Sequence, residues 1–207
     1  MSRKSNTEQR RKEITSALLR LLASQGYERA SIQNIAREAD LSPGLIHYHF
    51  KNKAEILMEL IAELRAVFEA RFTALLEKAH SPRERMLAYV NARLAKGSGE
   101  SPATVAAWVM IGAEAIKQEE VRALYANAIS QELKLVEGLI VDYLQERGKR
   151  VHSARRVAAS ILSAMEGSFQ LASAAAEHMP QAYAAKTMMA LIDRFVELEP
   201  VIEKKSK

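Results

Sequence analysis

The amino-acid sequence contains no cysteine, which excludes disulfide bonds and thiolate metal sites and is typical of a reducing compartment. Glycine and proline are scarce, with 8 and 5 residues, so few residues interrupt helices. No stretch approaches the ~18 uninterrupted apolar residues of a membrane span. The polar, basic residues 1–11 lack the apolar segment of a signal peptide. We therefore expect a cytoplasmic protein without a membrane partner.

The charge of the chain is concentrated near its N-terminus. The 207 residues carry a formal net charge of +5. Residues 1–53 contain ten Lys and Arg against five Asp and Glu, whereas the other 154 residues contain twenty of each. A local basic excess is the electrostatic feature expected of a protein that binds a polyanion. A solvated basic segment with no partner is the alternative.

Apolar residues recur at helical spacing along most of the sequence, and no segment shows the alternation of a half-buried strand. The pattern predicts an all-α protein with about nine helices, the first of them capped by Thr7. The expected helices cover about 7–25, 31–39, 42–49, 52–79, 81–95, 102–117, 119–147, 153–178 and 180–198. We expect a three-helix domain at 1–53 and a larger helical domain at 54–207.

The second and third helices are short and are joined by a tight turn at residues 39–41. Ser31 and Ser42 are favourable N-caps, and Pro43 suits the first helical position, where no N–H donor is needed. The apolar residues Ile35 and Ile46 are spaced to meet in a small shared core. A pair of short helices of this kind inside a basic segment indicates a helix-turn-helix, whose second helix enters the major groove of DNA.

The residues from 31 to 53 read SIQNIAREADLSPGLIHYHFKNK, and this stretch resembles the signature of the TetR family of transcriptional regulators. The resemblance extends over about 45 residues, from 13 to 57, and the long helical remainder also fits the family layout. Asp40 stands where the family usually has Gly, and Asp tolerates the left-handed conformation better than most residues. His47 stands at a position that is often Tyr.

The resemblance implies a role for each matching residue. Helix-start serines hold phosphates, the beginning of the third helix faces base edges, and the side chains at its end and at the start of the fourth helix contact phosphates or bases. The DNA-binding residues implied are Ser31, Ser42, Pro43, Gly44, Leu45, His47, Tyr48, His49 and Lys53. Phe50 is the core aromatic of the unit. His47 and His49 lie on different helix faces, and we expect no metal site and no cofactor.

Helices 153–178 and 180–198 are small or apolar on most of their circumference, which predicts burial on more than one side. We expect these two helices to form a four-helix bundle with their copies in a homodimer, as TetR-like regulators do. The alternative is an intramolecular core. The expected interface residues are Ala164, Ser168, Ala172, Met188, Leu191 and Phe195.

No catalytic signature is found in residues 54–207, so we expect a ligand-binding domain and not an enzyme. Segments around Trp108, Tyr125 and Met165 resemble the TetR subgroup that contains the choline-responsive repressor of betaine synthesis. Methionines and aromatics suit an adaptable apolar pocket, although such residues are as often plain core. The candidate ligand-binding residues are Met86, Tyr89, Trp108, Met110, Glu114, Tyr125, Met165 and Phe169.

The effector is expected to be amphipathic and mainly apolar. A quaternary ammonium would need an aromatic cage, and the chain has a single tryptophan. The function expected is that of a repressor released from a palindromic operator in double-stranded DNA by a small molecule. A helical enzyme with an incidental basic N-terminus and a DNA-binding protein with a filled core are the alternatives.

Overall fold

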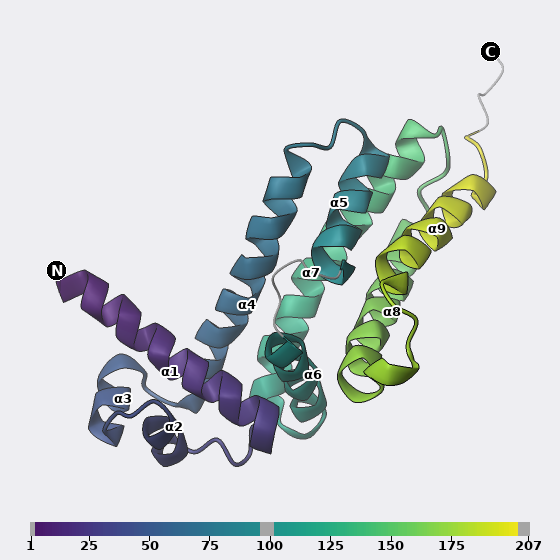
Figure 1. Cartoon of the computed structure of the whole chain (residues 1–207). Coiled ribbons are helices and arrows are strands. Elements are labelled where there is room, and N and C mark those ends of the chain that lie inside the picture. The colour runs from purple at the N-terminus through teal and green to yellow at the C-terminus, as the bar shows by residue number, and fades with distance from the viewer. Residues whose placement is uncertain (1–2, 96–101, 203–207) are drawn as a thin grey trace. The chain divides into compact units, whose positions relative to one another are not determined.

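A computed structural model describes residues 3–95 and 102–202. Over these residues the fold is nine α-helices and one 3-10 helix, with an isolated bridge between Lys149 and Val201 in place of any sheet. The all-α prediction is therefore confirmed (Figure 1). The elements are α1 Arg3–Gln25, α2 Ile32–Glu38, α3 Pro43–His49, α4 Lys53–Leu76, α5 Pro82–Leu94, α6 Pro102–Lys117, α7 Glu119–Glu146, α8 Ala154–Ala174, the 3-10 helix Ala176–His178 and α9 Tyr183–Leu198.

The predicted N-caps of the short helices are confirmed. Ser31 accepts a hydrogen bond from the backbone N–H of Asn34, and Ser42 accepts one from Leu45. Ser81 and Glu84 form a reciprocal capping box at the start of α5. Each of these bonds satisfies a helix-start N–H that has no partner inside its helix, which explains why serine predicts these boundaries.

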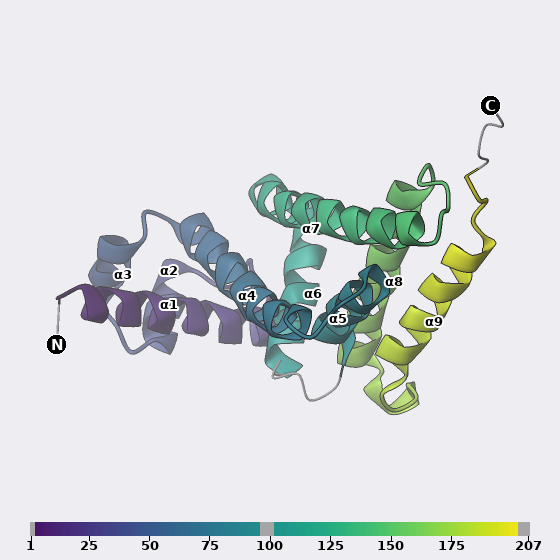
Figure 2. The same cartoon turned by 90° about the horizontal axis from the view of Figure 1, so that it is seen from above.

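Four helix boundaries differ from the predicted ones by three residues or more, one of them being the end of α4 at Leu76. α1 begins at Arg3, so Thr7 lies inside the helix and does not cap it. α8 ends at Ala174, and a 3-10 segment follows before α9 begins at Tyr183 (Figure 2). Pro180 explains part of this break, because the residue before a proline avoids the helical region and Met179 is extended.

The chain divides into two compact units. Unit 1 comprises residues 1–66 and 100–128, and unit 2 comprises residues 67–99 and 129–207. In unit 1, α2 and α3 lie against α1, and α6 packs on α1 as well (Figure 1). The buried side chains of α1 that hold this unit together are Ile14, Ala17, Leu18, Leu21 and Leu22. The packing against α1 and α2 holds the short helix α3 in place.

Unit 2 has its own hydrophobic core, built from the second part of α4 together with α5, α7, α8 and α9. α5 contacts α9 directly. Tyr89 and Met86 of α5 and Met165 of α8 are completely buried in this core. Each unit therefore has a core of its own, and the expected division of roles at residue 53 remains a prediction. Within the described ranges, no helix combines the length and apolar character needed to cross a bilayer.

Candidate DNA-binding surface and ligand domain

The turn between α2 and α3 depends on Asp40, whose φ is 55°. This left-handed conformation is unusual for a residue other than glycine, and it confirms the geometry expected where the family usually has Gly. The backbone N–H of Leu41 donates to Ala36 O at 2.9 Å and closes the turn. Ile35 and Ile46 are both completely buried. The turn and this core set the orientation of α3.

α3 presents one face to solvent. Ile46 is the residue of α3 that points into the core, whereas Ser42, Pro43, Gly44, His47 and Tyr48 are exposed, and Leu45, His49 and Ser31 are partly buried. Tyr48 is 76% exposed, and its ring meets the His49 ring edge-on, with centroids 5.0 Å apart. Five of the residues predicted to contact DNA, Ser42, Pro43, Gly44, His47 and Tyr48, are therefore accessible on α3 and its N-cap.

Arg11 of α1 holds the end of α3 in place. Its Nη1 donates to His49 O at 2.7 Å, and its Nη2 donates to Glu59 Oε2 of α4 at 2.9 Å. Its guanidinium lies 4.1 Å from the centroid of the Phe50 ring, within the range of a cation–π interaction. One side chain thus joins α1, the C-terminal end of α3 and α4.

The environment of His49 favours its neutral form. Burial lowers the pKa of the imidazole, and the positive charges of Arg11 and then Arg10 lower it further. At neutral pH, His49 therefore contributes a hydrogen-bonding group to the surface of α3 and little charge. A DNA phosphate beside this residue would favour the protonated form.

Lys53, at the start of α4, is directed toward Tyr27. Its Nζ donates to Tyr27 O at 2.9 Å and lies 3.9 Å from the centroid of the Tyr27 ring. Burial lowers the pKa of Lys53, while the carboxylates of Glu120, Glu114 and Glu28 oppose that shift. A phosphate contact by Lys53 would require this side chain to leave Tyr27, so its substitution would disturb packing as well as charge.

The eight candidate ligand-binding residues are divided equally between the two units. In unit 1, the rings of Trp108 and Tyr125 lie with centroids 5.2 Å apart and tilted by 40°. A Cβ on Gly26 would stand 3.6 Å from Met110 Cε and 3.7 Å from Glu114 Oε1. Trp108 thus lies beside Tyr125, whereas Met110 and Glu114 lie near Gly26, and residues two positions apart on α6 point to different faces of the helix.

The other four candidates belong to the core of unit 2. Met86 and Met165 are completely buried, and Tyr89 and Phe169 are 0% and 7% exposed. Arg93 of α5 lies 5.5 Å from the centroid of the Phe169 ring. These residues therefore line the interior of the unit and not its surface.

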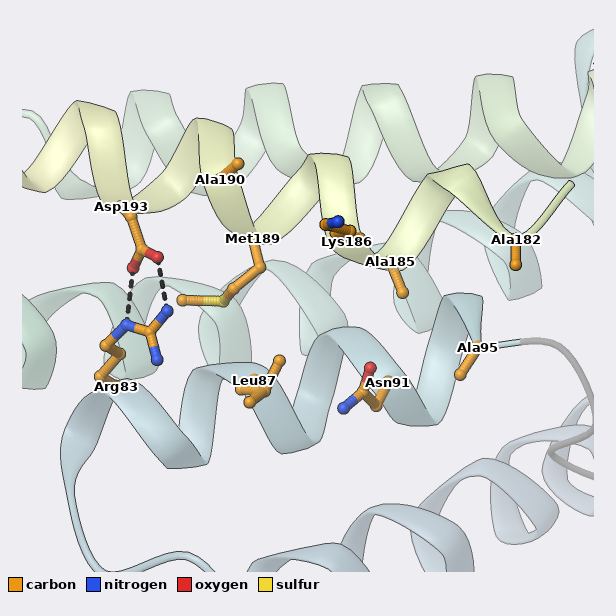
Figure 3. A pocket seen from close by; sticks show the side chains of 10 residues that line it. All are labelled: Arg83, Leu87, Asn91, Ala95, Ala182, Ala185, Lys186, Met189, Ala190 and Asp193. Carbon is orange, nitrogen blue, oxygen red and sulfur yellow. Dashed lines mark hydrogen bonds and ion pairs between the residues drawn. The ribbon is translucent and has the colours of Figure 1, made fainter. Parts of the chain in front are cut away.

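A groove of about 550 Å³ lies between α5 and α9 (Figure 3). At one end, Arg83 donates to both carboxylate oxygens of Asp193, at 3.0 and 2.6 Å. Tyr143 OH donates to the same carboxylate at 2.8 Å. The sequence reasoning named none of the residues that line this groove. Because Asp193 already neutralises Arg83, this end of the groove offers no free cation to a ligand.

The residues expected at the dimer interface differ in exposure. Leu191 is 62% exposed, whereas Met188 is 7% exposed and belongs to the core of unit 2. Ala164 and Ala172 are exposed, and Ser168 and Phe195 are partly buried. The exposed part of this surface therefore consists of small residues of α8 and leucine side chains of α9.

Comparison with protein families gives two matches. Residues 14–60 match "Bacterial regulatory proteins, tetR family", and residues 82–197, more than half of the chain, match "BetI-type transcriptional repressor, C-terminal". The chain belongs to the TetR family. The helix-turn-helix that the TetR signature predicts coincides with α2 and α3, and the BetI-type match covers α5 to α9 except their outermost residues.

Relatives of this TetR chain are transcriptional regulators. A BetI regulator of Rhizobium meliloti is 35% identical over 127 residues, which are 60% of this chain and 62% of the relative. The match therefore spans less than two thirds of the relative's length. A putative transcriptional regulator of Pseudomonas aeruginosa PAO1 superposes with a TM-score of 0.81 at 20% identity, over 92% of both chains. One from Saccharomonospora viridis, in complex with choline, gives 0.70 at 23% identity, over 95% and 100%.

Sequence reasoning missed two arginines that organise these sites. Arg11 shares a helix face with Ile14 and Leu18, at i, i+3 and i+7, and this spacing is the signal that could have placed it against the core. Arg93 gives no comparable signal, because its carboxylate partner Glu132 lies on another helix.

Proposed function

We propose that the chain is a cytoplasmic, homodimeric transcriptional repressor that binds a palindromic operator and is released by a small amphipathic effector. The observation that supports this proposal is the exposed face of α3, which is capped by Ser42, carries Tyr48 near its end, and is held in place by the buried Ile46. The major groove of DNA admits one α-helix, and the basic excess of residues 1–53 supplies attraction to phosphates.

The exposed surface of α8 and α9 supports the dimer. Leu191 and Leu198 are 62% and 67% exposed, and their spacing of seven residues places them on one face of α9. On α8, Ala164 and Gly167 are exposed, and small residues allow another helix to approach closely. Aligned apolar side chains in solvent mark protein contact sites. A two-fold dimer then presents two copies of α3 to two half-sites.

In this proposal, α4 transmits the effect of effector binding to the DNA-binding helix α3. This single helix contributes residues to both units, and its Glu59 reaches the end of α3 through Arg11. An effector that binds the released conformation more tightly than the DNA-bound one shifts the population toward release. A movement of α4 therefore changes the spacing of the two copies of α3.

The direct test is selection of DNA fragments by the purified protein from the genome that encodes it. We expect fragments with a shared two-fold symmetric sequence. Their affinity should fall roughly 10³- to 10⁵-fold between about 50 and 200 mM salt, as expected for about 6–10 phosphate contacts. Recovery of fragments without a common sequence would contradict operator recognition, even if binding were salt-dependent.

Substitution of Arg11 by Gln is expected to weaken operator binding by roughly 3- to 10-fold, because the cation–π and charge-assisted contacts that hold the end of α3 are lost. The same change should raise the pKa of His49, since the charge of Arg11 lowers it. Operator titration and an NMR titration of His49 measure the two effects.

The matched control is Lys12→Gln, which removes an exposed charge from the next position of α1. This control should leave the pKa of His49 unchanged. If Arg11→Gln alters affinity without moving that pKa, Arg11 does not act through the end of α3.

A further inference from the structure

The core of unit 2 contains a cluster of aromatic rings with a guanidinium in contact with it. The aromatic cluster comprises Phe68, Phe72 and Tyr89, and a fourth ring, that of Phe169, is connected to it through Arg93. The Phe68 and Phe72 rings are stacked with centroids 5.8 Å apart, and Tyr89 meets both of them edge-on, at 5.7 and 5.8 Å. All four side chains are no more than 7% exposed. Rings so arranged have the composition of an aromatic cage for a cation.

The cation in this cluster belongs to the protein. Arg93 of α5 places its guanidinium carbon 4.8 Å from the centroid of the Phe68 ring and 5.5 Å from that of Phe169. Both distances lie within the ~6 Å over which a ring face attracts a cation. The side chain of Arg93 is 14% exposed. The rings of Phe68 and Phe169 therefore already interact with a positive charge of the protein itself.

The counter-ion of Arg93 is also supplied from within. Glu132 of α7 is 8% exposed, and its Oε1 lies 3.3 Å from Arg93 Nε. The same oxygen accepts a hydrogen bond of 2.6 Å from Tyr89 OH. A buried carboxylate is stable only when it is paired and hydrogen-bonded. Arg93 thus pairs with the carboxylate of Glu132, which a bound cation would need as its counter-ion.

We propose that Arg93 is a specificity-determining residue that occupies the place of an ammonium head group and excludes quaternary ammonium effectors. A trimethylammonium group would have to displace the guanidinium of Arg93 from the faces of Phe68 and Phe169, and the nearby carboxylate of Glu132 is already paired with that guanidinium. The effector of this chain is therefore expected to lack a quaternary ammonium head group. This inference rests on the proposed function of an effector-responsive repressor.

The test measures choline binding to the full-length protein by isothermal titration calorimetry. Wild type is expected to show no binding at a choline concentration of about 1 mM. A Kd of about 1 mM corresponds to the free energy of a few cation–π interactions. Arg93→Gln retains a donor for Glu132 and removes the charge, so choline binding should strengthen by at least roughly tenfold. Arg93→Leu, which also frees the carboxylate, is the second variant.

Arg85→Gln is the matched control, because Arg85 lies on the same helix and pairs with Asp142 near the surface of the unit. This control should leave choline binding as weak as in wild type. Wild-type binding of choline with a Kd below about 1 mM would overturn the inference. So would a folded Arg93→Gln protein that binds choline no better than wild type.

Failure of the inference and failure of the proposed function give different results. If wild type binds choline and choline releases it from the selected operator, Arg93 does not exclude the cation but the repressor function stands. If the protein selects no operator, the proposed function fails, whereas the choline measurements on wild type and the Arg93 variants remain interpretable as a statement about ligand class.

Discussion

Replacement of Tyr48 by alanine is expected to weaken operator binding by roughly 30- to 1000-fold, from about 2–4 kcal/mol lost over two half-sites. Tyr48 is 76% exposed near the end of α3, and its ring meets that of His49 edge-on. The side chain therefore contributes little to folding, and the free energy of unfolding should change by no more than about 0.5 kcal/mol. Operator titration and chemical denaturation measure the two quantities.

Two further variants separate the causes of this loss. Tyr48→Phe retains the ring and removes the hydroxyl, so it isolates the hydrogen bond to DNA. Met58→Ala truncates a side chain of α4 that is 51% exposed and should leave operator affinity unchanged. An unchanged affinity of Tyr48→Ala would show that α3 does not contact DNA through this residue.

Replacement of Leu191 by arginine is expected to convert the dimer into monomers and to reduce operator affinity by more than about 1000-fold, since each monomer reads one half-site. Two-fold symmetry places the substitution at the interface twice. Each copy loses about 2 kcal/mol of apolar burial and adds a charge that has no partner there. Sedimentation equilibrium measures the mass, and operator titration measures the affinity.

Ala190→Arg is the control for this experiment. Ala190 is the neighbouring residue of α9 and lines the groove between α9 and α5 (Figure 3). This variant should remain a dimer and bind the operator as wild type does. A Leu191→Arg protein that is still dimeric would place the interface on another surface.

Local sequence signals predicted the helix boundaries well where a cap defines them. Ser31, Ser42 and Ser81 begin helices in the structure because their hydroxyl oxygens satisfy helix-start N–H groups. The helical pattern of the residues that follow each serine also indicates that a helix begins there. The turn at Asp40 was predicted for a similar reason, since few residues tolerate a φ of 55°. Such features depend on neighbours in the sequence, so they can be recognised without the fold.

Pairing between distant residues could not be predicted in this way. Arg11 and Glu59 are 48 residues apart, and Arg93 and Glu132 lie on different helices. Periodicity shows that one face of a helix is apolar, but it does not show what covers that face. Met188 illustrates the limit, because it shares an apolar stripe with Leu191 and yet is buried in the core of its own unit.

The predicted ligand residues illustrate a second limit. Methionines and aromatics were chosen for their chemistry, and the structure divides them between the two units. Trp108 and Tyr125 lie side by side in unit 1, whereas Tyr89 belongs to the core cluster of unit 2 and Phe169 is buried in the same unit. Residue type therefore suggested candidates for a ligand site, but it could not show which of these candidates lie in the same site.

Hydroxyl-radical footprinting of the wild-type protein on its selected operator tests most directly whether two copies of α3 read a palindrome. The account predicts two protected blocks related by two-fold symmetry, with half-site centres about 10 base pairs, or a multiple of this, apart. A single protected block, or uniform protection along the fragment, would contradict it.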